Sequence, residues 1–363
     1  KQKTAYEIRL SLVGSEMCIR DRRIPYKESH EESAVPLIEV PNARFHPCMD
    51  SFVGALHGVL TAIDSERQID ELWGLSTLAF RTQIHRTLDP VGLLPRQWDE
   101  TCARIFRRTG NEAMAGLRDF FYTGKDLREL QFVWMDTCEK ALEDGRPAIA
   151  FGLHGPAFGI IRGLDNDTEE YHVSTFLDGQ NDAPINVQDV GSQNPPLIFF
   201  IMPTGPVAEY DPHQAAMASL KEAVDHHLGQ EKNSAGEPVR VPADMVSGPG
   251  AYNAWSTAVE TAQVEPYWST GYYAGYYTEA RSAAAMWLRR LADSGEWTQA
   301  DAFRSAASHF DHEVECFSTI PLLFPFNQPD AIQDGARRTE ASACLRAARA
   351  EHIAAMEILA AAI

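Results

Sequence analysis

The chain has 363 residues, of which 44% are hydrophobic and 23% charged, a composition typical of a folded protein large enough for two domains. Its formal net charge is −19 and no segment concentrates Lys and Arg, which argues against a nucleic-acid or anionic-membrane surface. Six cysteines without a Cys-x-x-Cys pair argue against a disulfide framework and a zinc site, and no apolar run is long enough to span a bilayer. We therefore expect a cytoplasmic protein without metal or cofactor.

The first 22 residues, KQKTAYEIRLSLVGSEMCIRDR, fit neither a helical nor a strand period. They resemble the translated read-through of a sequencing adapter. We expect these 22 residues to pack against nothing, and residues 1–35 together to be a non-native or disordered leader.

The next stretch predicts a short strand followed by a helix. Residues Pro36–Val40 are apolar enough for an edge strand, and Asp50 or Ser51 is suited to cap a helix. One face of that helix would be apolar, through Phe52, Val53, Leu56, Val59, Leu60 and Ile63. Ser65 and Gln68 have capping-box spacing and predict the start of a second helix.

Residues 88–125 contain several glycines and prolines, which predict short helical pieces. Residues Lys125–Asp144 then show an apolar stripe at helical spacing, with Gly145 suited to the C-terminal cap.

The following segment predicts an antiparallel meander. Ala148–Leu153 and Phe158–Leu164 are apolar runs of strand length, and Tyr171–Phe176 alternates into a third strand. Pro196–Met202 is one more strand of the buried type. Together with the preceding helices, these strands predict an α/β domain over residues 36–203.

Beyond Pro203 the composition changes to Ala-rich helical patterns without strands. We predict an α-helical domain over residues 204–363, with Gly229–Pro242 as a surface connector inside it. Its helices are expected at 212–228, 244–263, 272–293, 297–319 and 331–362.

Several short motifs occur in an order that resembles a known family. The most extended is the meander GRPAIAFGLHGPAFGIIRGLDNDTEEYHV, and shorter blocks follow the same order: Trp73–Ser76, Ala79–Arg81, Gly250–Tyr252, Tyr276–Arg281 and Leu323–Phe326. The chain resembles the butirosin biosynthesis H-like group, relatives of the C39-type papain-like cysteine peptidases. This resemblance implies a papain-like α/β domain with an antiparallel sheet, followed by an α-helical domain.

The resemblance also implies a catalytic Cys at the start of the first helix and a His at the opening of a strand. Cys48 occupies the first position, where free amides and the helix dipole would lower the pKa of a thiol, but the neighbouring Asp50 adds an opposing negative charge. Ala157 occupies the expected His position, so His154 is the nearest imidazole. Thr175 stands where a group that orients the His is expected.

Two functional hypotheses follow. The first is amide hydrolysis or acyl transfer by Cys48 and His154 on a small-molecule, peptide or acyl-carrier substrate. The alternative is a catalytically inactive papain-like protein that binds a small molecule, peptide or carrier protein. A base within hydrogen-bond reach of the Cys48 sulfur would discriminate between them. A third possibility is a purely structural helical partner domain.

Other polar residues have weaker patterns. Asp165 suits a turn, and His172 could face either side of its strand. A helical stripe of aromatic residues favours a packed core, while Glu279 and Arg281 beside it could supply polar groups to a cleft between the domains. The pairs His226 and His227, and His309 and His312, lack the converging carboxylates or thiols of a metal site. The i, i+3 spacing of the second pair is geometrically usable, but no metal site is predicted there.

Overall fold

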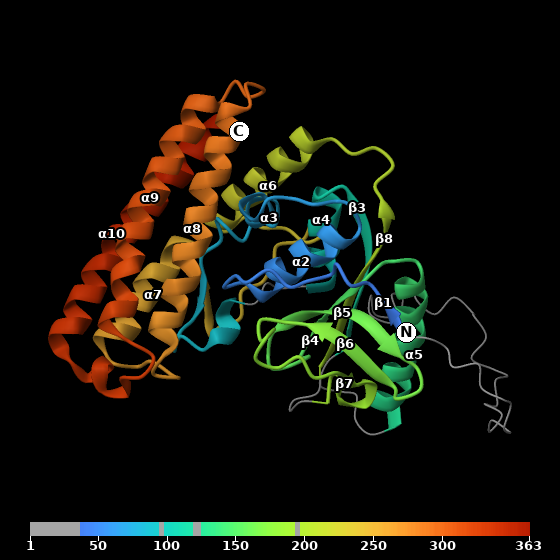
Figure 1. The fold of residues 1–363 in the computed structure, drawn as a ribbon. Coiled ribbons are helices and arrows are strands. Elements are labelled where there is room, and N and C mark those ends of the chain that lie inside the picture. Colours follow the sequence, from blue (N-terminus) through green and yellow to red (C-terminus); the bar gives the residue numbers. More distant parts are fainter. Residues whose placement is uncertain (1–36, 94–97, 119–124, 193–196) are drawn as a thin grey trace, which may run out of the picture. The chain divides into compact units, whose positions relative to one another are not determined.

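The structure is a computed structural model that describes residues 37–93, 98–118, 125–192 and 197–363 (Figure 1). The predicted leader, residues 1–35, lies outside the described residues. Residues 37–363 form one compact unit of mixed α and β structure. The predicted boundary between residues 203 and 204 stays a prediction.

An antiparallel sheet organises the first half of the described chain. Its seven strands run in the order β3-β8-β4-β5-β6-β7, and β1 pairs with β5. The strands are β1 (Ile38–Glu39), β3 (Asn111–Arg118), β4 (Ala148–Phe151), β5 (Phe158–Asp165), β6 (Glu170–Ser174), β7 (Ile185–Asn186) and β8 (Ile198–Pro206). The meander β4-β5-β6 is confirmed, because Ile149 pairs with Ile160 and Ile161 with Val173.

Strand β3 was not expected, because its glycines were interpreted as breaks between helical pieces. A Cβ on Gly116 would lie 2.4 Å from the Trp134 side chain, so the glycine makes room for that ring. A second correction is β9 (Met245–Ser247), which lies beyond Pro203 and pairs with β2 (Gln83–His85).

Helix α2 (Ser51–Ala62) packs on β5. A Cβ on Gly58 would lie 2.0 Å from the Arg44 carbonyl oxygen and 2.6 Å from the Ile160 Cδ1 atom, so this position requires glycine. The predicted capping box for the next helix is wrong, because Ser65 Oγ accepts a hydrogen bond from Asn111 instead. That helix, α3 (Ile69–Leu75), begins after Gln68.

Helices α4 (Trp98–Arg108) and α5 (Lys125–Glu143) flank the sheet. Short 3₁₀ turns are η1 (Pro90–Leu93), η2 (Val187–Asp189) and, in the helical second half of the chain, η3 (Pro329–Gln333).

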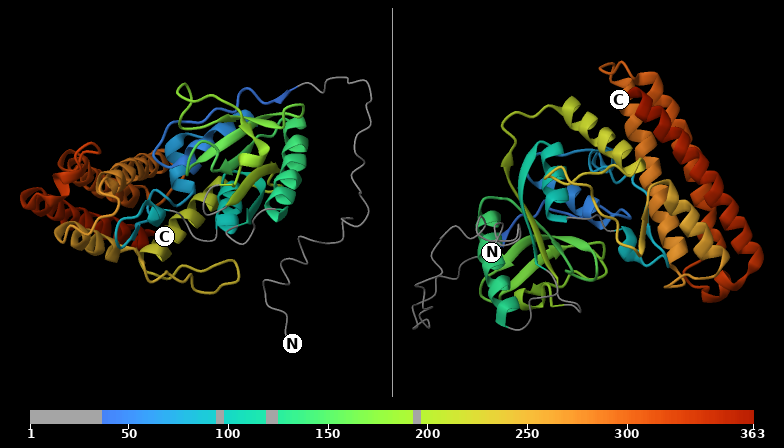
Figure 2. Two further views of the ribbon diagram at one scale, coloured as in Figure 1. Left: turned by 90° about the horizontal axis from the view of Figure 1, so that it is seen from below. Right: turned by 180° about the vertical axis from the view of Figure 1, so that it is seen from behind.

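The second half of the chain is mainly helical, as predicted. Its helices are α6 (Pro212–His227), α7 (Pro249–Glu260), α8 (Ser269–Asp293), α9 (Ala300–Leu323) and α10 (Gly335–Ala362). Figures 1 and 2 show α8, α9 and α10 side by side. None of the helices within the described ranges is long and apolar enough to cross a membrane.

A fully buried ion pair joins α8 to α9. Arg281 Nε donates to Glu313 Oε1 over 3.0 Å, and neither side chain is exposed. The same guanidinium donates to the Ala79 carbonyl oxygen over 2.6 Å and to Thr82 Oγ1 over 2.5 Å. Arg281 therefore holds the segment that leads into β2 against the helices.

Candidate functional site

The N-terminus of α2 is capped by Asp50. One oxygen of its carboxylate accepts hydrogen bonds from the Phe52 and Val53 amides over 2.9 and 3.0 Å. The other oxygen accepts from the Tyr276 hydroxyl over 3.0 Å. Burial raises the pKa of Asp50. The helix amides that would stabilise a thiolate are therefore already bonded to a carboxylate.

Cys48 lies two residues before this cap. Its thiol donates a hydrogen bond to the Asp50 carbonyl oxygen over 2.9 Å. Burial raises the pKa of Cys48 far above its ordinary value, and the negative charges of Asp50 and Glu279 raise it further. Glu279 is held close to this site because its Oε2 atom accepts from the Met49 amide over 2.9 Å. The surroundings of Cys48 thus favour a neutral thiol.

His154 lies in the turn between β4 and β5. Its Nδ1 atom is 3.5 Å from Thr175 Oγ1, and among the described side chains no hydrogen bond or ion pair joins it to Cys48. The start of β5 does lie against the start of α2, since the Phe158 amide donates to Ser51 Oγ over 3.0 Å. The start of the helix and the start of the strand are therefore in contact, while the hydrogen-bond partner of the His154 imidazole is Thr175 and that of the Cys48 thiol is the Asp50 carbonyl oxygen.

Two further polar residues considered in the sequence occupy a turn and a strand of the sheet. Asp165 accepts hydrogen bonds from the Asp167 and Thr168 amides, which makes it a turn residue. His172 is half-buried between two buried neighbours on β6. The catalytic roles of Cys48 and His154 stay predictions.

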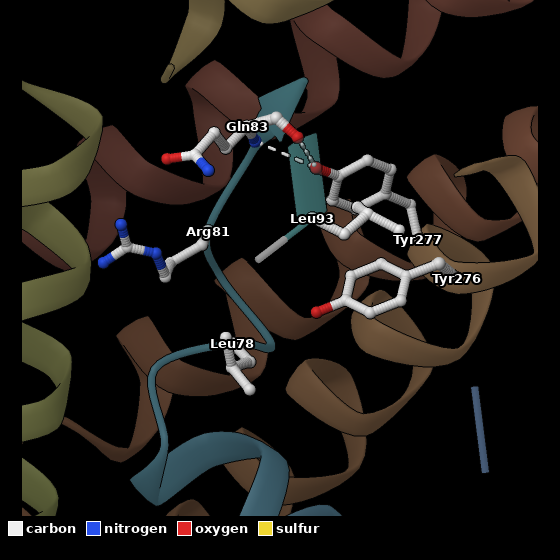
Figure 3. A pocket seen from close by; sticks show the side chains of 6 residues that line it. All are labelled: Leu78, Arg81, Gln83, Leu93, Tyr276 and Tyr277. Carbon is white, nitrogen blue, oxygen red and sulfur yellow. Dashed lines mark hydrogen bonds between the residues drawn. The ribbon is translucent and has the colours of Figure 1, made fainter. Parts of the chain in front are cut away.

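A small hollow adjoins Tyr276, on the side of α8 that faces β2 (Figure 3). Its volume of about 10 Å³ suits a single water molecule at most. Tyr277 and Gln83 also line it, and the Tyr277 hydroxyl accepts from the Gln83 amide over 2.9 Å and donates to the Gln83 carbonyl oxygen over 2.6 Å. Arg81 also lines the hollow, but its guanidinium points away from both tyrosines (Figure 3).

Arg81 reaches a much larger cleft, which we call the arginine cleft. The cleft has a volume of about 580 Å³ and lies between α4, α6 and the segment after α6. Six cationic and four acidic side chains line it: Arg81, Arg104, Arg107, Arg108, Lys221, Lys232, Glu100, Glu222, Asp225 and Glu231. The side chains that line the cleft thus carry an excess of positive charge, although the whole chain has a formal net charge of −19.

Glu222 is the centre of the charge network in the arginine cleft. Its carboxylate oxygens lie 2.6 Å from Arg108, 3.0 Å from Arg104 and 4.0 Å from Arg81. Burial alone would raise the pKa of Glu222, but the three guanidinium groups outweigh it and lower the pKa. Glu222 is therefore ionised and holds the arginines together.

The arginines are fixed in place by further contacts. Arg108 donates to the Leu75 carbonyl oxygen over 3.2 Å and to Thr77 Oγ1 over 2.9 Å. Arg81 donates to Glu231 Oε1 over 2.5 Å, and the same carboxylate lies 2.9 Å from His226 Nδ1. Burial opposes the ionisation of Glu231, yet the hydrogen bond from His226 and the charge of Arg81 lower its pKa to about 2.

Two lysines add positive charge to the arginine cleft. Lys221 and Lys232 line the arginine cleft, and neither forms an ion pair within the part of the chain that the structure describes. A partial signal for this cleft is visible in the sequence, where Arg104, Arg107 and Arg108 follow one another on α4. The contribution of α6 could not be found from sequence, because it lies more than a hundred residues away.

No family model and no curated protein matches this chain. The functional conclusion therefore rests on the geometry of the two regions described above.

Proposed function

We propose that the chain is a papain-like protein without cysteine catalysis that binds an anionic ligand in the arginine cleft. The observation that carries the proposal is the excess of cationic side chains around a cleft of about 580 Å³. This volume falls within the range of roughly 300 to 1,000 Å³ that is usual for small-molecule sites.

The surroundings of Cys48 support the absence of catalysis. A nucleophilic thiolate needs a base or a cation nearby, whereas Cys48 lies beside Asp50 and Glu279. Its hydrogen bond to the Asp50 carbonyl oxygen also requires that the thiol keep its proton.

The arrangement of the arginines supports an anionic ligand. Guanidinium groups bind carboxylates and phosphates through paired N–H donors, and Glu222 already accepts hydrogen bonds from Arg104 and Arg108 within the cleft. Lys221 and Lys232 remain as point charges at the same cleft. The chemistry favours a small molecule that carries carboxylate or phosphate groups.

The proposal is tested by calorimetric titration of the purified protein with citrate and with inorganic pyrophosphate. We expect saturable binding that weakens as salt is added, because exposed charges are screened over about 10 Å at 0.1 M ionic strength. The double variant Lys221→Gln/Lys232→Gln should weaken binding by about tenfold, in line with the loss of roughly 1.4 kcal/mol.

Lys140 on α5 provides a matched control, since it is exposed and does not line the arginine cleft. The Lys140→Gln variant removes one positive charge and should bind both anions like the parent protein. Equal weakening of anion binding by Lys140→Gln and by the double variant Lys221→Gln/Lys232→Gln would reject a specific site.

A second candidate function is the cysteine-dependent hydrolysis or acyl transfer that the family resemblance implies. The contact between Ser51 and Phe158 favours it, because it brings the start of α2 to the start of β5. A test is release of product from amide and thioester substrates by the full chain and by Cys48→Ala. Turnover that disappears in Cys48→Ala would support this function.

A further inference from the structure

Two histidines and a glutamate meet where α9 and α10 pack together. His309 and His312 lie one turn apart on α9, and Glu351 comes from α10. Glu351 Oε2 is 2.7 Å from His309 Nδ1 and 3.5 Å from His312 Nδ1. The three ligand atoms all lie within 4.8 Å of one another.

This arrangement corrects the expectation that the histidine pair lacks a converging carboxylate, because Glu351 supplies one. The sequence could not reveal the partner, because Glu351 is 42 residues from His309. Packing of α9 on α10 brings them together.

The distances suit a tetrahedral metal ion. Zinc binds imidazole nitrogen and carboxylate oxygen at about 2.0 to 2.2 Å, which puts neighbouring ligand atoms roughly 3.3 to 3.6 Å apart. The two distances from the Glu351 oxygen, 2.7 and 3.5 Å, lie close to this separation. Small rotations of the three side chains would therefore be enough to place them around one ion.

The surrounding helix fixes the position of the glutamate. Ala348, His352 and Ala355 are buried on α10, so the helix cannot turn without exposing them. Glu351 lies at the edge of that buried face and is about one-third exposed. His312 is more than half exposed, which leaves the site open to solvent.

We propose that His309, His312 and Glu351 form a binding site for a divalent transition metal such as Zn²⁺. Two imidazoles and one carboxylate favour zinc, cobalt or nickel over magnesium and calcium, which prefer all-oxygen sites. Three protein ligands leave the fourth position of a tetrahedral ion to water or to an exchangeable ligand. This site lies on α9 and α10, whereas the arginine cleft is formed by other elements, so the two proposals stand independently.

Calorimetric titration of chelator-treated full-length protein with ZnCl₂ tests the site. We expect one Zn²⁺ per chain, and a rise in the melting temperature because the ion binds only the folded protein. Each of His309→Ala, His312→Ala and Glu351→Gln should weaken Zn²⁺ binding by at least about tenfold, the scale seen when metal sites lose a supporting group. Tetrahedral Co²⁺ absorption should appear in the parent protein and be lost in the same variants.

His213 on α6 serves as the control, because it is exposed and stacks on Trp297 with a ring-centre distance of 3.9 Å. The His213→Ala variant should bind Zn²⁺ like the parent. The three site residues are all partly exposed, so circular dichroism and the melting temperature without metal should match the parent. Absence of Zn²⁺ binding, or binding unchanged in the double variant His309→Ala/His312→Ala, would overturn the proposal.

Discussion

Two carboxylates in this protein are held by arginine in contrasting surroundings. Glu313 and Arg281 are both completely buried between α8 and α9. Glu222 retains 19% of its side-chain exposure and lies among three arginines that line an open cleft. Both carboxylates pair with arginine, but only Glu222 lies in an open cleft that also holds exposed cations, Lys221 and Lys232.

The difference separates a structural role from a binding role. Every donor group of Arg281 is directed at Glu313, at the segment before β2 or at Tyr252, so no ligand can compete for it. In the arginine cleft, one glutamate is shared by Arg81, Arg104 and Arg108. The first region therefore fixes the fold, whereas the second is suited to accept an anion.

The largest expected effect comes from breaking the buried pair. Arg281→Met leaves the Glu313 carboxylate buried without its cation and should lower the free energy of unfolding by about 3 to 5 kcal/mol. Urea unfolding followed by circular dichroism measures the change.

Arg289→Met is the matched control for that experiment. Arg289 and Asp311 also join α8 to α9, but both are more than 40% exposed. Exposed pairs contribute only about 0 to 1 kcal/mol, so this variant should unfold close to the parent. Similar losses in both variants would contradict the distinction between buried and exposed pairs.

His352 adds a pH dependence to the buried network. Burial lowers the pKa of its imidazole to about 4 from an ordinary 6.5, although Glu313 Oε2 lies 3.4 Å away and opposes this shift. Between these two pH values the unfolded chain binds a proton at His352 that the folded chain does not. The contribution of neutral His352 to the free energy of unfolding is therefore complete above pH 6.5 and is lost as the pH falls towards 4.

The expected loss over that range is about 3 kcal/mol, at 1.36 kcal/mol per pKa unit. When urea unfolding is measured from pH 7 to pH 4, the free energy of unfolding should fall less steeply with decreasing pH for His352→Gln than for the parent. His172→Gln, on β6 and outside this network, should keep the parent slope. An unchanged slope in His352→Gln would mean that other groups set the acid sensitivity.

Short-range patterns predicted much of the fold. The meander follows from alternating apolar runs, and the Asp50 cap follows from a carboxylate just before an apolar helical stripe. Strand β3 was missed because Gly116 was interpreted as a break between helical pieces. The residue at this position has to be small because the Trp134 ring packs against it. Local sequence cannot reveal a contact with a ring from another element.

The candidate sites were harder to predict for the same reason. The prediction that a helix follows Cys48 was confirmed, since α2 begins at Ser51. Glu279, which raises the pKa of Cys48, belongs to α8 and lies more than 200 residues later in the chain. The arginine cleft combines α4 with α6, and the proposed metal site combines α9 with α10. Each of these sites depends on tertiary packing that no spacing rule encodes.

A smaller effect on stability is expected at the open carboxylate. Glu222→Gln removes the negative charge shared by three arginines and should cost about 1.5 kcal/mol, the value of a hydrogen bond to a charged group. The same change adds positive charge to the arginine cleft, so pyrophosphate should bind several-fold more tightly. Calorimetry and urea unfolding on one sample measure both, and weaker pyrophosphate binding would contradict the proposed role of the cleft.

The smallest expected effect concerns Cys48, because its surroundings predict an unreactive thiol. Burial and the charges of Asp50 and Glu279 raise the pKa of Cys48, so little thiolate exists near neutral pH. Iodoacetamide at pH 7.5 should therefore label Cys48 no faster than the partly exposed Cys316 and Cys344. His154→Ala should leave the rate unchanged, since the imidazole contacts Thr175. Peptide mass spectrometry over a time course gives each rate in the same sample, and rapid Cys48 labelling that slows in His154→Ala would instead support the cysteine enzyme.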